Sequence, residues 1–114
     1  MKIIISPAKL LDLKNKVPIN SYTKCQFLDK SAELNEKLRK LSAKELSKLM
    51  KISNDLGQLN YERNQQWQRE FSIENAKQAV YTFAGPVYKG IDAYSIKEDK
   101  ILDLQNKLRI LSGL

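Results

Sequence analysis

The stretch "SAKELSKLMKISNDLGQLNYERNQQW", Ser42–Trp67, decides how the middle of this chain folds. Its first four residues form a capping box, in which the serine side chain accepts from the backbone of Glu45 and the glutamate reaches back to the serine. Apolar residues then recur at helical spacing, with Leu46, Leu49 and Leu56 on one face. We expect one helix from this box to about Gln68, weakened or kinked at Gly57, where glycine costs about 1 kcal/mol relative to alanine.

Short strands and further helices are expected on either side of this helix. The predicted elements are a buried strand over 2–6, a helix over 32–41 capped by Ser31, a short helix from Ser72, a strand over 79–85, a turn-rich connection over 85–90, a helix after a second capping box at 95–98, and a strand over 109–113. The β-branched run of the first strand does not alternate, which is typical of a central or parallel strand. The order of elements predicts a mixed α/β (α+β) fold with a small sheet and helices in a single domain.

The composition excludes several classes of site. Cys25 is the single cysteine and the chain has no histidine, so an internal disulfide, a zinc site of the usual ligands and a Ser-His-Asp triad are excluded. No catalytic residue, metal site or cofactor is predicted. The sequence has no apolar run long enough to cross a membrane, and the start "MKIIISPAK" is too short for a signal-peptide core. We therefore expect a cytoplasmic protein.

The charge of the chain favours a polyanionic partner, with nucleic acid first. The formal net charge is +7, and residues 1–60 carry 12 Lys and Arg against six Asp and Glu. Three lysines share one face of the long predicted helix, and such a stripe suits phosphate contacts that do not depend on base sequence. The alternative is a helix face kept soluble by lysine. The candidate phosphate contacts are Lys9, Lys44, Lys48, Lys51 and Arg63, the last interleaved with Tyr61 and Trp67.

Two loops at predicted strand ends are a second candidate site. "SPAK" follows the first strand and "FAGPVYKG" follows the strand over 79–85. In sheets with helical crossovers, ligands gather beyond the carboxyl ends of strands. The candidate ligand-loop residues are Ser6, Lys9, Tyr88 and Gly90. They support an alternative function, an enzyme or binding protein for a phosphorylated small ligand, against a purely structural turn at each place.

Four segments in this order resemble the YaaA family of bacterial peroxide-stress resistance proteins. They are "IIISPAK" from Ile3, "ISNDLGQLNYERNQQW" from Ile52, "FAGPVYKG" from Phe83 and "LRILSGL" from Leu108. The likeness covers essentially the whole chain. Members of the family continue past the last segment, so the resemblance implies the N-terminal part of a larger single domain. Apolar surface left uncovered in such a part favours self-association.

The resemblance also carries functional expectations. It implies a cytoplasmic protein, made under hydrogen peroxide stress, that limits damage by keeping free iron low and has no established enzyme activity. It implies non-sequence-specific binding of duplex or branched DNA through a positively charged cleft and a helix-hairpin-helix-like element. The residues carried over by the matching motifs are Lys9, Arg63, Tyr88, Gly90, Arg109, Ser112 and Gly113. Through this resemblance Arg109 joins the candidate phosphate contacts. Leu10 stands where the family often has threonine, so a hydroxyl that could bind phosphate is absent.

Direct iron binding is the alternative explanation of a protective role. The sequence argues against it, because it has no histidine, one cysteine and one close group of acids, Glu98, Asp99 and Asp103. These acids also suit the N-terminal turn of a helix.

Overall fold

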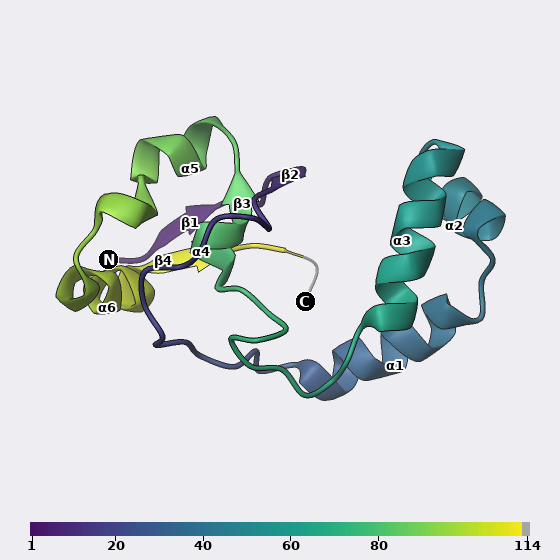
Figure 1. The fold of residues 1–114 in the computed structure, drawn as a ribbon, viewed down its shortest axis with the longest axis horizontal. Helices are drawn as coiled ribbons and strands as arrows, with labels where there is room; N and C mark the ends of the chain where they lie inside the picture. Colours follow the sequence, from purple (N-terminus) through teal and green to yellow (C-terminus); the bar gives the residue numbers. More distant parts are fainter. Residues whose placement is uncertain (113–114) are drawn as a thin grey trace. The chain divides into compact units, whose positions relative to one another are not determined.

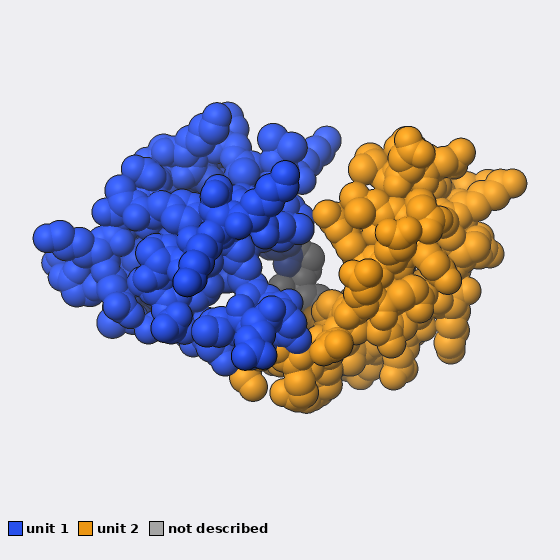
Figure 2. All heavy atoms as spheres, viewed as in Figure 1, with its two compact units in different colours: residues 1–23, 72–114 blue, residues 24–71 orange. Residues whose placement is uncertain are grey.

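The computed structural model describes residues 1–112, which fall into two compact units (Figures 1 and 2). Unit 1 joins Met1–Thr23 to the segment from Ser72 onward, and unit 2 is Lys24–Phe71. The elements in chain order are β1 (Ile3–Ile5), β2 (Leu10–Leu11), α1 (Leu28–Arg39), α2 (Ala43–Met50), α3 (Asn54–Gln66), α4 (Ala79–Thr82), β3 (Phe83–Ala84), α5 (Pro86–Ile91), the 3-10 helix η1 (Ala93–Ser95), α6 (Glu98–Lys107) and β4 (Leu108–Ile110). The mixed fold class is thus confirmed. Of the carried-over residues, Gly113 lies outside the described part.

Two small sheets form in unit 1. β1 pairs in parallel with β4, with Ile3 opposite Leu108, and β2 pairs antiparallel with β3, with Leu11 opposite Phe83. The parallel pairing of the first predicted strand is confirmed, but its burial is wrong, because Ile4 is 63% exposed. In the described residues β1 has β4 as its one partner strand, so it is an edge strand rather than a central one, and Ile3 is exposed on it as well.

The core of unit 1 lies where α4, η1 and α6 meet. Its buried side chains are Ile19, Tyr81, Ala93 and Ile101. Tyr81 is 1% exposed, and its hydroxyl has no hydrogen-bond partner within the described residues. Burial raises the pKa of this phenol above its ordinary value, so the neutral form is favoured.

We expect Tyr81→Phe to raise the free energy of unfolding by about 1 kcal/mol, because it removes a buried hydroxyl that makes no hydrogen bond. Tyr88→Phe is the matched control. The Tyr88 hydroxyl donates to the Ser6 carbonyl at 2.8 Å, so its loss should lower stability by about 1 kcal/mol. Urea denaturation of both variants measures the two signs. A loss of stability in Tyr81→Phe would show that the hydroxyl is hydrogen-bonded in solution.

Unit 2 consists of three helices, and α2 and α3 replace the single long helix that the sequence predicts. The capping box at the start of α2 is confirmed: the Ser42 amide donates to Glu45 Oε2 at 2.8 Å, and the Glu45 amide donates to Ser42 Oγ at 3.3 Å. The predicted break at Gly57 is wrong. α2 ends at Met50, its C-cap Lys51 turns the chain with a left-handed backbone (φ 54°), and Ser53 then caps α3.

The other helix boundaries also differ from expectation. α1 begins at Leu28 with no side-chain cap, so Ser31 lies inside the helix, and Asp29 supplies the negative charge of the first turn. The helix predicted from Ser72 is a single turn, closed by the amides of Asn75 and Ala76 on the Ser72 carbonyl.

The strand predicted over 79–85 is helical in its first half. The Thr82 hydroxyl donates to the Gln78 carbonyl at 2.9 Å, which helps to close the turn α4 before β3 begins. The connection predicted over 85–90 is mostly the helix α5, with proline at its first position. The capping box predicted at 95–98 is wrong, because Ser95 Oγ donates to the Asp92 carbonyl and α6 has Lys97 as its N-cap.

Candidate nucleic-acid interface

The candidate interface is the α2–α3 hairpin of unit 2, two helices joined by the three residues 51–53 (Figure 1). Leu46, on α2, is fully buried. Ser47 is also buried, and its single hydroxyl hydrogen is shared between the carbonyls of Ala43 (3.0 Å) and Ser53 (3.3 Å). One side chain therefore ties the first turn of α2 to the start of α3.

Gly57 is what lets the two helices approach. A Cβ atom at this position would lie 1.8 Å from Ser47 Oγ and 2.7 Å from the Ala43 carbonyl oxygen. No side chain fits at such distances, so glycine is required by contact rather than by a bend. Gly57, which the sequence marks as a weak point of one helix, is therefore a place of close contact between two helices.

Three lysines, which we call the hairpin lysines, lie on α2 and its C-cap. Lys44 and Lys48 are one turn apart, and all three side chains are exposed. The prediction of three lysines on one helix face is wrong for Lys51, because α2 ends at Met50. Within the described residues no ion pair engages the hairpin lysines. Hydrogen bonds from Ser42 are the main reason that the pKa of Glu45 is lowered, with a smaller contribution from Lys48.

Arg63, the predicted phosphate contact of α3, lies in the last turn of that helix. Arg63 is exposed, and its carbonyl accepts from the Trp67 amide at 3.0 Å. The helix ends there, so Trp67 is a half-buried C-cap with extended backbone rather than part of the helical face.

Sequence reasoning missed Arg39, which caps the end of α3 from α1. Its guanidinium donates to the carbonyls of Asn64 (2.9 Å), Gln65 (2.8 Å) and Trp67 (2.7 Å). The buried Asn35 donates to the Asn64 carbonyl as well, at 3.1 Å. The partners lie 25 or more positions away along the chain, and no local spacing rule marks such a contact.

The other predicted phosphate contacts lie in unit 1. Lys9 is exposed beside β2. Arg109 is exposed on β4, where its Nη1 donates to the carbonyls of Gln105 (2.7 Å) and Leu108 (2.6 Å) at the end of α6. Arg109 therefore has a structural role that the resemblance does not indicate.

The ligand-loop residues are brought together only in part. The Tyr88 hydroxyl bonds the Ser6 carbonyl, which places α5 against the loop after β1. Tyr88 also lines a cavity of about 170 Å³ in unit 1, whereas Ser6, Lys9 and Gly90 do not. Gly90 is exposed, and a Cβ atom there would meet nothing within 4 Å.

The comparisons with known proteins bear on this geometry. The family described as peroxide stress protein YaaA matches residues 1–114. The chain belongs to this family. A UPF0246 protein of Flavobacterium psychrophilum is 54% identical over 113 residues, which are 99% of this chain and 45% of the relative. A UPF0246 protein of Flavobacterium johnsoniae is 50% identical and one of a Marinomonas species 45% identical, each over 100% of this chain and 45% or 44% of the relative.

The YaaA-family chain thus spans less than half the length of these relatives. Among its described residues, no helix has the length and apolar character that a membrane span requires. No group of three or more Cys, Asp or Glu side chains in that part is placed to hold a metal ion.

The left-handed C-cap Lys51 allows the effects of a substitution on stability and on DNA binding to be distinguished. Lys51→Gly should raise the free energy of unfolding by about 0.5–1 kcal/mol, because glycine adopts a φ of 54° without strain. The same change removes one hairpin charge and should weaken DNA binding. Lys51→Ala loses the charge and keeps the strain, so it should weaken binding equally without the gain in stability. Unchanged DNA affinity in both variants would exclude Lys51 from the interface.

Proposed function

We propose that this chain binds DNA through the hairpin lysines, contacting phosphates without reading bases, as part of a cytoplasmic defence against hydrogen peroxide. The observation that carries the proposal is the hairpin itself: two short helices locked at Gly57, with Lys44, Lys48 and Lys51 exposed and outside any ion pair in the described residues. Ammonium groups of this kind neutralise phosphates and release counterions. Membership of the peroxide stress protein family supports the biological setting.

The proposal assigns a binding role rather than catalysis to this chain. Protection of DNA would follow from covering the duplex or a branched junction, with Lys9, Arg63 and Arg109 as further phosphate contacts. Limiting iron-dependent damage is proposed for the whole family protein, and no residue of this chain is assigned to iron.

Self-association is a second part of the proposal. Several apolar side chains of unit 1 are largely exposed, among them Ile4, Leu10 and Leu111. Two copies that share such surface would bury it from water and would present two basic hairpins to one DNA. Sedimentation of the chain with and without Ile4→Lys tests this part, because the charge should abolish a dimer formed through β1.

The experiment for DNA binding is fluorescence anisotropy of labelled duplex and four-way-junction DNA between about 50 and 200 mM salt. Changing the hairpin lysines together to glutamine should reduce the slope of log K against log salt by about 3, since each phosphate contact contributes about 0.9. The matched control changes three exposed lysines of unit 1, Lys14, Lys16 and Lys100, to glutamine. Equal losses in both triple variants would show that net charge, not the hairpin, carries binding.

A further inference from the structure

The cavity of unit 1 is not used by the proposed DNA interface. It has a volume of about 170 Å³ and lies between the α4–β3 segment and the segment formed by α5 and η1. Four aromatic side chains line it, and we call it the aromatic cup: Tyr81, Phe83, Tyr88 and Tyr94. The rings form two close pairs, Tyr81 with Tyr94 (5.1 Å between centroids) and Phe83 with Tyr88 (5.5 Å).

The hydroxyl hydrogens of two of these tyrosines are already committed. Tyr88 donates to the Ser6 carbonyl at 2.8 Å, and Tyr94 lies within hydrogen-bonding distance of Asp12 Oδ2 (3.1 Å) and of the Tyr81 carbonyl (3.3 Å). What these two hydroxyl groups still offer is oxygen lone pairs, because a phenol donates once. Asp12 and Asp92 also line the cup, and their carboxylates are acceptors. The lining therefore combines acceptors with aromatic side chains, of which Tyr81 and Tyr88 are almost fully buried.

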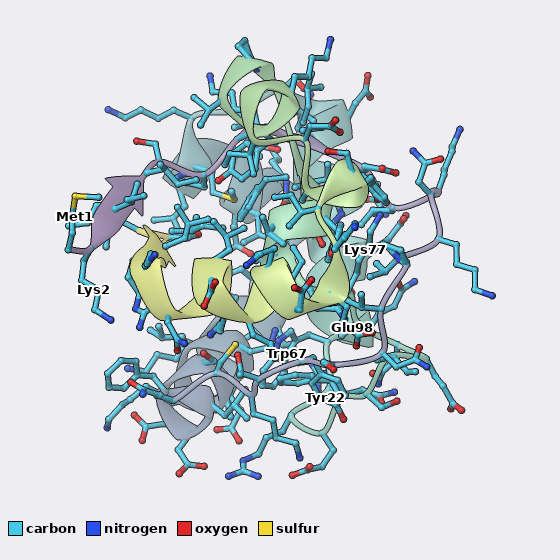
Figure 3. The ribbon with its side chains drawn as sticks, turned by 90° about the vertical axis from the view of Figure 1, so that its left-hand side faces the viewer. Met1, Lys2, Tyr22, Trp67, Lys77 and Glu98 are labelled. Atoms are coloured by element: carbon cyan, nitrogen blue, oxygen red, sulfur yellow. The ribbon has the colours of Figure 1, made fainter. Side chains whose placement is uncertain are left out.

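The ammonium group of Lys77 lies beside two residues of the aromatic cup, Asp12 and Tyr94. Lys77, labelled in Figure 3, has a side chain only 13% exposed, and its Nζ lies 3.6 Å from Asp12 Oδ1 and 5.8 Å from the centre of the Tyr94 ring. Its Nζ also donates to the carbonyls of Asp12 (2.7 Å) and Asn15 (2.9 Å). Carboxylate and ring together thus stabilise a largely buried cation at one side of the cup.

Asp12 and Asp92 differ in whether their carboxylates are already engaged by other groups of the chain. Asp12 accepts from the amides of Lys14 and Asn15 and from the Asn15 side chain, and these bonds hold its pKa well below the ordinary range. These hydrogen bonds and the ion pair with Lys77 engage both oxygen atoms of the Asp12 carboxylate. Within the described residues no ion pair or side-chain hydrogen bond engages the carboxylate of Asp92, which is therefore the free negative charge of the cup.

We propose that the aromatic cup binds a small organic cation, a primary amine on a short apolar stem, with its ammonium group at Asp92 and its stem against the aromatic rings. Lys89, also in the lining, is the charge that opposes this ligand. A phosphorylated ligand, which belongs to the alternative function that the sequence offers near Tyr88, would meet the free carboxylate of Asp92 and no free hydroxyl hydrogen from Tyr88 or Tyr94. Removing the charge of Asp92 should weaken the binding of an amine and strengthen that of a phosphorylated ligand. Removing the charge of Lys89 should have the opposite effect on each.

The test is titration of the ¹⁵N-labelled chain with phenethylamine, n-butylamine, inorganic phosphate or ribose 5-phosphate, followed by amide chemical shifts. We expect the amines to shift the amides of Gly85, Ala93 and Tyr94 saturably. Asp92→Asn should weaken amine binding by about three- to fivefold, because it removes an ion pair with an exposed carboxylate and keeps the shape. Lys89→Gln should strengthen it about twofold, because it removes a repulsive charge. Asp103→Asn, the same change at an exposed position of α6, is the control and should have no effect.

Two results would overturn the proposal. One is the absence of saturable shifts with either amine at concentrations up to about 10 mM, which would exclude a dissociation constant of about 1 mM or lower. The other is binding of phosphate or ribose 5-phosphate that Lys89→Gln weakens and Asp92→Asn strengthens, which would assign the cup to a phosphorylated ligand. The amide spectrum of each variant shows directly that unit 1 is folded, so loss of structure is not mistaken for loss of binding.

Discussion

Gly57→Ala is expected to lower the free energy of unfolding of unit 2 by about 2–4 kcal/mol, the range of severe overpacking. The added Cβ would lie 1.8 Å from Ser47 Oγ and 2.7 Å from the Ala43 carbonyl oxygen. Ser47 can rotate away only by giving up its hydrogen bonds to Ala43 and Ser53. The backbone carbonyl cannot move without shifting α2. Both helices must therefore separate, although alanine is the better helix former.

Gly90→Ala is the control for this prediction. Gly90 lies in the helix α5, and an added Cβ meets no atom within 4 Å. The change should leave stability unaltered or raise it by about 0.5–1 kcal/mol, because alanine loses less conformational freedom on folding. Urea denaturation followed by circular dichroism measures both variants. If Gly57→Ala were as stable as Gly90→Ala, the close packing of α2 on α3 would be wrong.

A double variant locates the cause of the expected loss. Ser47→Ala removes the oxygen atom nearest to the new Cβ but leaves the Ala43 carbonyl in place. We expect Ser47→Ala to restore part of the stability lost in Gly57→Ala, so that the two changes are not additive. Additive losses would mean that the Ser47 side chain is not what Gly57 accommodates.

Ser42, Lys51 and Gly57 together show which features of the hairpin can be predicted from the sequence. The capping box at Ser42 is predicted correctly because all its partners lie within three residues. The break at Lys51 is missed because no glycine marks it and the left-handed residue is a lysine. The role of Gly57 is missed because the atoms it must avoid belong to another helix.

The same reasoning applies to the candidate sites. A run of isoleucines predicts a strand, but its exposure depends on what else packs on the sheet, and Ile4 is largely exposed. The motif residues Tyr88 and Ser6 do meet, through a hydrogen bond across 82 positions. The aromatic cup is not predicted from the sequence, because Asp12 and the lining residues of 80–94 come together only through the fold. Local patterns thus predict elements and candidate residues, whereas long-range contacts decide which residues share a site.

Arg39→Met is expected to lower the free energy of unfolding of unit 2 by about 2 kcal/mol. It would remove donors from the carbonyls of Asn64, Gln65 and Trp67, of which the first two are carbonyls of the last turn of α3. Hydrogen bonds to a charged donor contribute about 1.5–3 kcal/mol when shielded, and the exposure of Arg39 reduces that value. Methionine keeps most of the apolar stem, so the loss reports on the guanidinium. Trp67, the single tryptophan, lies at the affected end and reports unfolding by its fluorescence.

Arg69→Met provides the matched comparison, because Arg69 forms only surface ion pairs with Asp29 and Glu70 among its described contacts. Such pairs contribute less than about 1 kcal/mol, so this variant should be clearly more stable than Arg39→Met. The two arginines also separate structure from binding. Arg39→Met should reduce apparent DNA affinity only by the fraction of unit 2 that is unfolded, and it should leave the salt slope unchanged, since no phosphate contact is lost. A reduced slope in Arg39→Met would place this arginine on the DNA and would shift the interface from the hairpin towards the end of α3.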